Sequence, residues 1–425
     1  MTFLAQGLTL VLALGSSIII ARVLGPKGQG IYSMAIMLPA ILIAFANLGI
    51  GSASIYYIGK RQFALSKILG ANIFYAILLS LLAVGIALLI VFFFAHETFP
   101  GIRRDFLLLS LTLIPFQLFF NYGLSFLVGI QNIKKYNLIR IFRAFLFLLI
   151  LIFIFFVSHF SITTAIIALC LSFSITCIPL FVEIKKEANG VEVSLDKGMM
   201  LDFMSYGSKI NLANLIVLLH KRIDIFLINF FLNPIAVGYY AIAAVLSERI
   251  WLISQPAGTV LFPKVASETN KKTLKEFTPR VCRNILLITF LIAVVFYFLS
   301  RWLITFFYSD QYVESVLPFQ ILLFGMISIS GSRILSTDLA GRNKVGVNIW
   351  LNFLSLCINV ILNLFLIPTQ GIMGAAWATT ISYTITFVGR IVVYSKVSGN
   401  RITDILFLKK SDLKYYKNLY DKCVR

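Results

Sequence analysis

Charged residues are scarce in this chain. Asp, Glu, Lys and Arg make up 13% of its 425 residues, and apolar residues make up 59%. A typical soluble domain has about 25% charged residues. A chain of this length with so little charge cannot cover a large core with a solvated surface, so its main solvent must be lipid. The composition excludes an ordinary soluble protein.

Residues that build reactive or metal sites are also few and scattered. Cys170, Cys177 and Cys357 lie inside apolar runs, and no two cysteines have the spacing of metal ligands. The three histidines stand far apart. There is no P-loop, no Gly-x-Ser-x-Gly motif and no paired aspartate motif on a loop. We therefore expect no metal, no cofactor and no enzymatic activity.

Acidic residues are outnumbered by basic ones. The chain has 37 Lys and Arg against 17 Asp and Glu, a net charge of +20. Binding to nucleic acid would require a basic face, and none is found, because the basic residues stand in short segments between apolar runs. Membrane proteins carry their cytoplasmic charge in such segments. The pattern argues against a nucleic-acid partner and predicts a multi-pass protein of the cell (inner) membrane, with both termini in the cytoplasm.

Apolar runs long enough to cross a membrane recur along the whole chain. A span needs about 20 residues to cross about 30 Å of hydrocarbon. We expect an all-α integral membrane fold of about twelve transmembrane helices in two six-helix bundles. The expected spans are 2–21, 33–58, 72–95, 106–129, 138–157, 162–183, 205–231, 235–262, 282–308, 314–335, 346–368 and 371–396. The expected domains are an N-terminal bundle over 1–183, a cytoplasmic linker over 184–204, a C-terminal bundle over 205–396 and a basic cytoplasmic tail over 397–425.

One short pattern occurs twice, 208 residues apart. Leu24–Tyr32 follows the first span and Leu232–Tyr240 follows the seventh, and both read L-x-P-x-x-x-G-x-Y. The two copies fall at equivalent places in the order of helices. Because six helices separate them, the two halves should share one orientation, as in transporters built from parallel repeats. In that plan the substrate site lies between the halves.

Charge inside a span is the strongest indication of function. It costs about 2.5–3.5 kcal/mol per residue on insertion scales. The seventh span contains His220, Lys221, Arg222 and Asp224, whereas the equivalent part of the first span has no charge. Either this segment is the cationic wall of a cavity, or Lys221 and Asp224 form a salt bridge that fixes helix packing. We favour the cavity, because Arg222 points away from Asp224 on a helix.

Polar side chains also form stripes in the last two spans. Asn348, Asn352, Ser355, Asn359 and Asn363 keep one helical face of the eleventh span. The stripe of the twelfth span is Thr379, Tyr383, Thr386 and Arg390. Such side chains either bond neighbouring helices together or line a cavity, and the sequence leaves both interpretations open. The eighth span adds Glu248 and Arg249.

Several motifs resemble those of the polysaccharide repeat-unit flippases, of the O-antigen type, in the multidrug/oligosaccharidyl-lipid/polysaccharide (MOP) exporter superfamily. The matching segments are Ala21–Pro26, Gly30–Tyr32, Asn47–Gly49, Ile55–Ile58, Arg222–Asp224, Val237–Tyr240, Leu246–Glu248 and Leu261–Val265. The resemblance covers nearly the whole chain, and the order and spacing of the motifs together make it specific. The resemblance implies two bundles around a cationic cavity that moves an undecaprenyl-diphosphate-linked oligosaccharide outward by alternating access, for surface polysaccharide or lipopolysaccharide assembly.

The charged and polar residues inside the spans give the candidate site, and the resemblance adds the candidate partners. The expected substrate-binding residues are Lys221, Arg222, Arg249, Arg390, Asn211, Asn214, Asn352, Asn359 and Tyr383, and the candidates for ion coupling are Asp224, Glu248 and His220. The expected partners are the lipid-linked oligosaccharide, membrane lipid, and a polysaccharide polymerase with chain-length proteins. Two alternatives remain. A multidrug/cation antiporter would need acidic residues in its first helices, and a membrane glycosyltransferase or polymerase would need a large outer loop.

Overall fold

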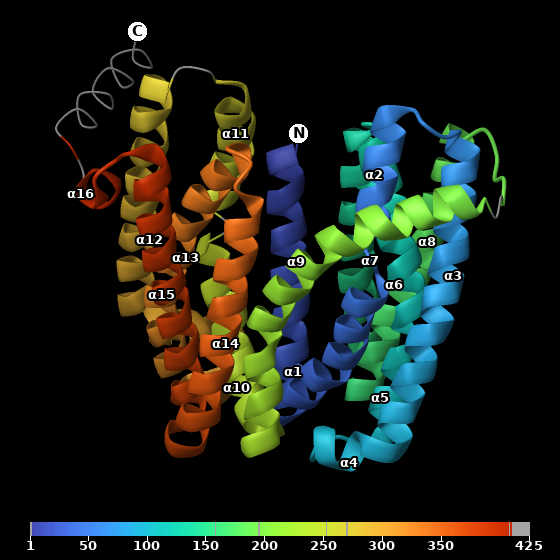
Figure 1. The fold of residues 1–425 in the computed structure, drawn as a ribbon. Helices are drawn as coiled ribbons and strands as arrows, with labels where there is room; N and C mark the ends of the chain where they lie inside the picture. Colours follow the sequence, from blue (N-terminus) through green and yellow to red (C-terminus); the bar gives the residue numbers. More distant parts are fainter. Residues whose placement is uncertain are drawn as a thin grey trace, which may run out of the picture. The chain divides into compact units, whose positions relative to one another are not determined.

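The computed structural model of the protein describes residues 2–157, 159–193, 196–251, 253–268, 271–407 and 409, and within these ranges it is built from helices without a strand (Figure 1). The first helices are α1 (Thr2–Ala46), α2 (Ile50–Lys60), α3 (Leu65–Leu89), a π-helical turn (Ile90–Phe94), α4 (Ala95–Thr98), α5 (Arg104–Leu111), α6 (Leu113–Gly129), α7 (Ile133–Val157) and α8 (Ile162–Glu187). They are followed by α9 (Lys197–Phe231), α10 (Pro234–Trp251), α11 (Ser254–Ser267), α12 (Lys271–Tyr308), a 3-10 helix (Asp310–Ser315), α13 (Val316–Gly341), α14 (Val345–Gln370), α15 (Ile372–Ser398) and α16 (Ile402–Leu406). Most of the tail predicted over 397–425 lies outside the described residues.

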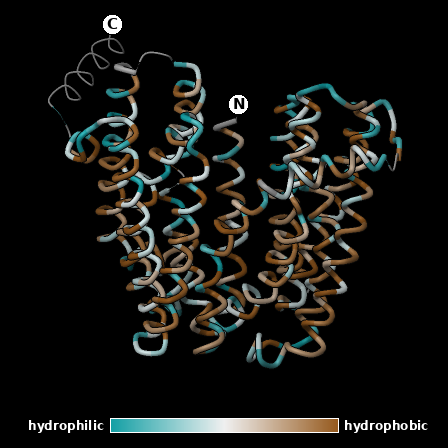
Figure 2. Tube along the Cα trace, in the orientation of Figure 1, coloured by the Kyte–Doolittle hydropathy of each residue, from teal (hydrophilic) through white to brown (hydrophobic). Residues whose placement is uncertain are grey.

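These helices confirm the predicted all-α membrane fold. Nine helical segments of the described chain are long and apolar enough to cross a membrane, and α10 with α11, bent by 42°, forms a tenth candidate. The count differs from twelve for two reasons. Two expected spans run together in α1, which is broken only at Gly25, and charged and amide side chains keep α9 out of the apolar set. Figure 2 shows hydrophobic residues along most of the helices and hydrophilic ones gathered at many helix ends and loops.

The chain divides into two compact units, Met1–Gly238 and Tyr239–Arg425. Each has an apolar core of its own. In the first unit Ile20, Tyr32 and Leu151 are buried together, and in the second Cys282 and Tyr394 belong to such a cluster. The domain boundaries expected from the sequence stay a prediction.

The segment between α8 and α9 is attached to the first unit. The backbone N–H of Glu192 donates to the carbonyl oxygen of Ser66 over 3.1 Å, at the start of α3. The Tyr75 hydroxyl of α3 donates to the carbonyl oxygen of Met200 in α9 over 3.0 Å. Tyr206 of α9 stacks on Tyr56 of α2, with 4.2 Å between ring centroids. These contacts fix the first half of α9 and thereby position the charged second half.

The two copies of the repeated pattern pack against each other. Gly25 breaks α1 with a φ of 65°, and the helix resumes at Pro26, just as α10 begins at Pro234. Proline suits the first turn of a helix because no N–H is needed there. A Cβ added to Gly30 would lie 1.7 Å from the carbonyl oxygen of Pro234, and one added to Gly238 would lie 2.0 Å from that of Pro26. Each glycine therefore meets the proline of the other copy.

Candidate functional site

The charged segment of α9 contains one arginine that its neighbours do not neutralise. His220 and Asp224 are buried, and Lys221 and Arg222 are half-buried. His220, Lys221 and Asp224 each have an interaction partner. Arg222 has no hydrogen-bond or ion-pair partner among the residues that the structure describes. This is the arrangement expected if Arg222 points away from Asp224.

A polar face on a membrane helix must look into protein or water. We therefore predict that cysteine at position 222 reacts with small charged thiol reagents in a chain whose native cysteines are alanine. The matched control is Asn211→Cys on the same helix, because Asn211 is buried and donates from its amide to the Ala44 carbonyl oxygen over 3.0 Å. Labelling should be at least tenfold faster at 222 than at 211. Equal protection at the two positions would contradict a water-exposed Arg222.

The amides of α9, of which Asn211 and Asn214 are the predicted substrate-binding residues, have different surroundings. Asn211 bonds to α1, as described above, and Asn229 donates to the carbonyl oxygen of Pro100 over 3.2 Å. Both amides are buried and hold α9 on the first unit. Asn214 is exposed. Within this predicted set, therefore, Asn214 remains available to a ligand, whereas Asn211 has a packing role.

Arg390 of α15 is bound in the second unit. It is only 4% exposed, and its guanidinium donates to the Ser332 hydroxyl and to the Asn352 amide oxygen, both over 2.5 Å. These partners stand on α13 and α14 and are neutral. Its Nε is buried without a hydrogen-bond partner in the described chain. The structure thus brings Arg390 and Asn352 together. The Arg390 side chain links α15 to α13 and α14 by hydrogen bonds.

The stripe of α14 faces α15. Asn359 is fully buried, and its amide donates to the hydroxyls of Thr379 over 3.3 Å and Ser382 over 3.5 Å. Ser355 donates to the Ser382 carbonyl oxygen over 3.2 Å. Tyr383 is buried on the same stretch of α15. Of the two interpretations left open by the sequence, these contacts favour hydrogen bonding between helices.

We predict that Asn359→Ala lowers stability slightly and leaves transport intact. Hydrogen bonds between membrane helices contribute about 0.6 kcal/mol on average. The melting temperature of the purified variant should fall by a few degrees, while surface polymer in a complemented strain stays near the wild-type level. Loss of polymer at unchanged stability would instead place Asn359 in the substrate path.

Two arginines lie near the break between α10 and α11. Arg249 is half-buried beside Glu248, and its Nε has no hydrogen-bond partner among the described residues. Arg333 of α13 lies over the Trp251 ring, 4.8 Å from its centroid. Arg333 is not among the candidate residues named from the sequence, although it lies inside the expected tenth span, 314–335, and inside α13. An arginine within a long apolar run was the signal that would have identified it.

Comparison with known proteins identifies the family. A family model described as polysaccharide biosynthesis protein matches residues 1–269. The chain belongs to this family. An archaeal relative, the uncharacterized membrane protein MJ1068 of Methanocaldococcus jannaschii, is 24% identical over 84% of this chain and 75% of its own. The probable low-salt glycan biosynthesis flippase Agl15 of Haloferax volcanii is 26% identical over 40% of this chain and 36% of its own.

Solved structures share the fold. The lipid II flippase MurJ in an inward closed conformation superposes with a TM-score of 0.77 at 15% identity, over 95% of this chain and 88% of that chain. An inward-facing multidrug resistance MATE family transporter of the MOP superfamily gives 0.73 at 15% identity, over 92% and 94%. The family is therefore that of polysaccharide biosynthesis proteins, and the fold is that of MOP transporters.

Proposed function

We propose that the chain is a flippase that moves an undecaprenyl-diphosphate-linked oligosaccharide from the inner to the outer leaflet of the cell membrane by alternating access. The product would serve surface polysaccharide assembly, such as O-antigen. Family membership and the similarity to a probable glycan flippase support a transporter of this pathway. The observation that carries the substrate class is Arg222, a half-buried cation of α9 without an acidic partner in the described chain.

The chemistry of arginine suits a diphosphate. A guanidinium presents a planar fork of donors that matches two phosphate oxygens at once, and such charge-assisted bonds are stronger than neutral ones. Arg249 and Arg333 supply further cations in the second unit. The acidic groups nearest in sequence, Asp224 and Glu248, are our candidates for ion coupling, together with His220. In this proposal Arg222 binds the diphosphate of the lipid, and amides such as Asn214 bind sugars.

A multidrug/cation antiporter is the second candidate, favoured by the similarity to the MATE transporter structure. Such a protein needs a carboxylate to attract a cationic drug. Residues 1–96 contain no Asp or Glu, so the first spans lack one. A guanidinium such as that of Arg222 repels a cation by the same Coulomb energy that attracts a phosphate. The charge sign therefore favours the lipid diphosphate.

Ligand-induced stabilisation tests this choice. A ligand that binds the folded state alone raises stability by RT ln(1 + [L]/Kd), or about 2.7 kcal/mol at a hundredfold excess over Kd. We predict that a short-chain polyprenyl-diphosphate sugar raises the melting temperature of the purified protein by several degrees, more than the monophosphate does. A cationic dye should have no effect. Stabilisation by the dye alone would favour the antiporter.

A further inference from the structure

An apolar groove lies between three helices of the first unit. It has a volume of about 460 Å³ and is formed by α3, α6 and α8. The residues that line it are Ile73, Ala76, Ile77, Pro115, Phe116, Phe119, Ser174, Cys177, Ile178, Phe181 and Val182. Ile77 and Ile178 are 58% and 65% exposed, so the groove opens on the surface of the helices. Its lining suits a hydrocarbon chain.

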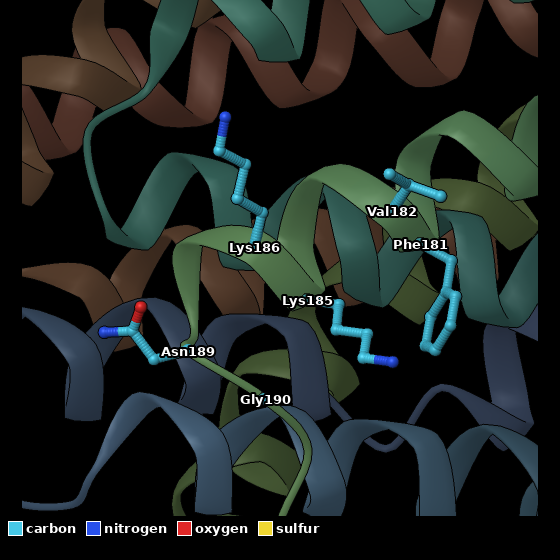
Figure 3. A pocket seen from close by; sticks show the side chains of 6 residues that line it. All are labelled: Phe181, Val182, Lys185, Lys186, Asn189 and Gly190. Carbon is cyan, nitrogen blue, oxygen red and sulfur yellow. The ribbon is translucent and has the colours of Figure 1, made fainter.

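A second hollow, of about 470 Å³, continues the groove toward the end of α8. The two share Phe181 and Val182, and the second is also lined by Lys185, Lys186 and Asn189 (Figure 3). Positions 177, 178, 181, 182, 185 and 186 follow the spacing of one helical face of α8, and Asn189 lies in the turn that follows the helix. Along this single face, α8 changes from apolar to cationic.

The length of the face matches one leaflet of a membrane. Eleven residues separate Ser174 from Lys185, which corresponds to about 16 Å at 1.5 Å per residue. Half of a hydrocarbon core is about 15 Å thick. A chain lying from Ser174 to Phe181 would therefore place its headgroup at the two lysines.

The lysines are available to an anion. Glu183 is paired with Lys135 over 3.0 Å, and Glu187 accepts a hydrogen bond from Asn132 over 2.9 Å. Neither Lys185 nor Lys186 has an ion-pair partner among the residues that the structure describes, and both are exposed. The nearest acids on α8 are thus engaged elsewhere, and a local excess of two positive charges remains.

We propose that this groove binds one anionic phospholipid, with its phosphate at Lys185, whose side chain lies beside Phe181 (Figure 3), with Lys186 as a second nearby cation, and with one hydrocarbon chain along Phe181, Ile178 and Ser174. The amide of Asn189 supplies a further donor to the headgroup. The site is separate from the arginines discussed above and does not depend on the proposed transport activity. The bound lipid would hold the end of α8, where the chain turns toward α9.

Native mass spectrometry of the full-length protein tests the site. The probes are phosphatidylglycerol, phosphatidylcholine and inorganic phosphate, each added to delipidated protein. We expect one phosphatidylglycerol to be retained at activation energies that remove phosphatidylcholine. Lys185→Gln with Lys186→Gln should weaken its binding about thirtyfold. The control, Lys134→Gln with Lys197→Gln, removes the same charge from two other exposed lysines and should change nothing.

A second variant tests the hydrocarbon part. Ser174→Phe fills the groove without altering charge and should also release the lipid, while the melting temperature in detergent stays unchanged. Equal retention of phosphatidylglycerol by wild type and the Lys185/Lys186 variant would overturn the proposal. So would equal retention of the two lipids, or displacement of phosphatidylglycerol by free phosphate, which would show an anion site without a lipid.

Discussion

Arg222→Glu is expected to abolish the export of surface polymer without reducing the amount of protein in the membrane. The substitution replaces a guanidinium that attracts a phosphate pair by a carboxylate that repels it. Disrupting a hydrogen-bonded charge pair costs about 2–5 kcal/mol, which corresponds to at least about thirtyfold in binding. Because Arg222 has no acidic partner in the described chain, its replacement leaves no carboxylate of the protein without an ion-pair partner. The defect should therefore concern substrate and not folding.

A graded series at the same position separates charge from shape. Arg222→Lys keeps the charge and loses the planar fork, so we expect partial export. Arg222→Gln should export less, and Arg222→Glu nothing. Surface polymer in a complemented flippase-deficient strain measures export, and membrane immunoblots measure abundance. Normal polymer from the glutamate variant would count decisively against phosphate recognition by α9.

Gly30→Ala is expected to destabilise the protein and to stop transport. The added methyl group would lie 1.7 Å from the backbone carbonyl oxygen of Pro234, a distance that no side-chain rotation relieves. Overpacking usually costs about 1–3 kcal/mol. Here the first turn of α10 must move away from α1, which disrupts the reciprocal contact of Gly238 with Pro26. We expect a melting temperature lower by several degrees and loss of surface polymer.

Gly85→Ala is the matched control in α3, because nothing lies within 4 Å of the Cβ that it adds. Alanine is favoured over glycine in a helix by about 1 kcal/mol, so this variant should be neutral or slightly more stable. Gly238→Ala should behave like Gly30→Ala, since its Cβ would lie 2.0 Å from the Pro26 carbonyl oxygen. If Gly30→Ala and Gly85→Ala gave the same melting temperature and the same amount of surface polymer, the contact between the repeated turns would not be needed for stability or transport.

These turns could be predicted from the sequence because glycine and proline act on the local backbone. Gly25 adopts a left-handed φ, and Pro26 and Pro234 each begin a helical segment. Spacing alone could not predict that the two copies would meet, since residues 208 positions apart are joined only by tertiary packing. The same limit explains why Asn211 was placed on a ligand-binding face. Its bond to the Ala44 carbonyl oxygen depends on how α9 lies on α1.

Charged residues inside a span can be found in the sequence more readily than contacts between helices. The segment from His220 to Asp224 was identified because a membrane makes charge costly wherever it lies in a span. Arg333 lies in an expected span as well, but it is a single charge two residues from the end of that span, and its contact with the Trp251 ring arises only from tertiary packing. The groove proposed to bind a lipid could not be predicted from the sequence for another reason. It is formed by three helices, and only the face of α8 is periodic in the sequence.

Reconstituted translocation is the most direct test of the proposed flippase. Purified protein in liposomes is supplied with a polyprenyl-diphosphate oligosaccharide that carries a fluorescent label on its sugar, and an impermeant reductant destroys the label on the outside. Empty liposomes should retain about half of the signal, since one leaflet is protected. With the protein, we predict that the protected half is lost within minutes, and that Arg222→Glu restores protection. The contradicting result has two parts: half of the fluorescence survives the reductant in the presence of wild-type protein, and the same liposomes accumulate a cationic dye. That result would exclude the flippase and identify a cation transporter.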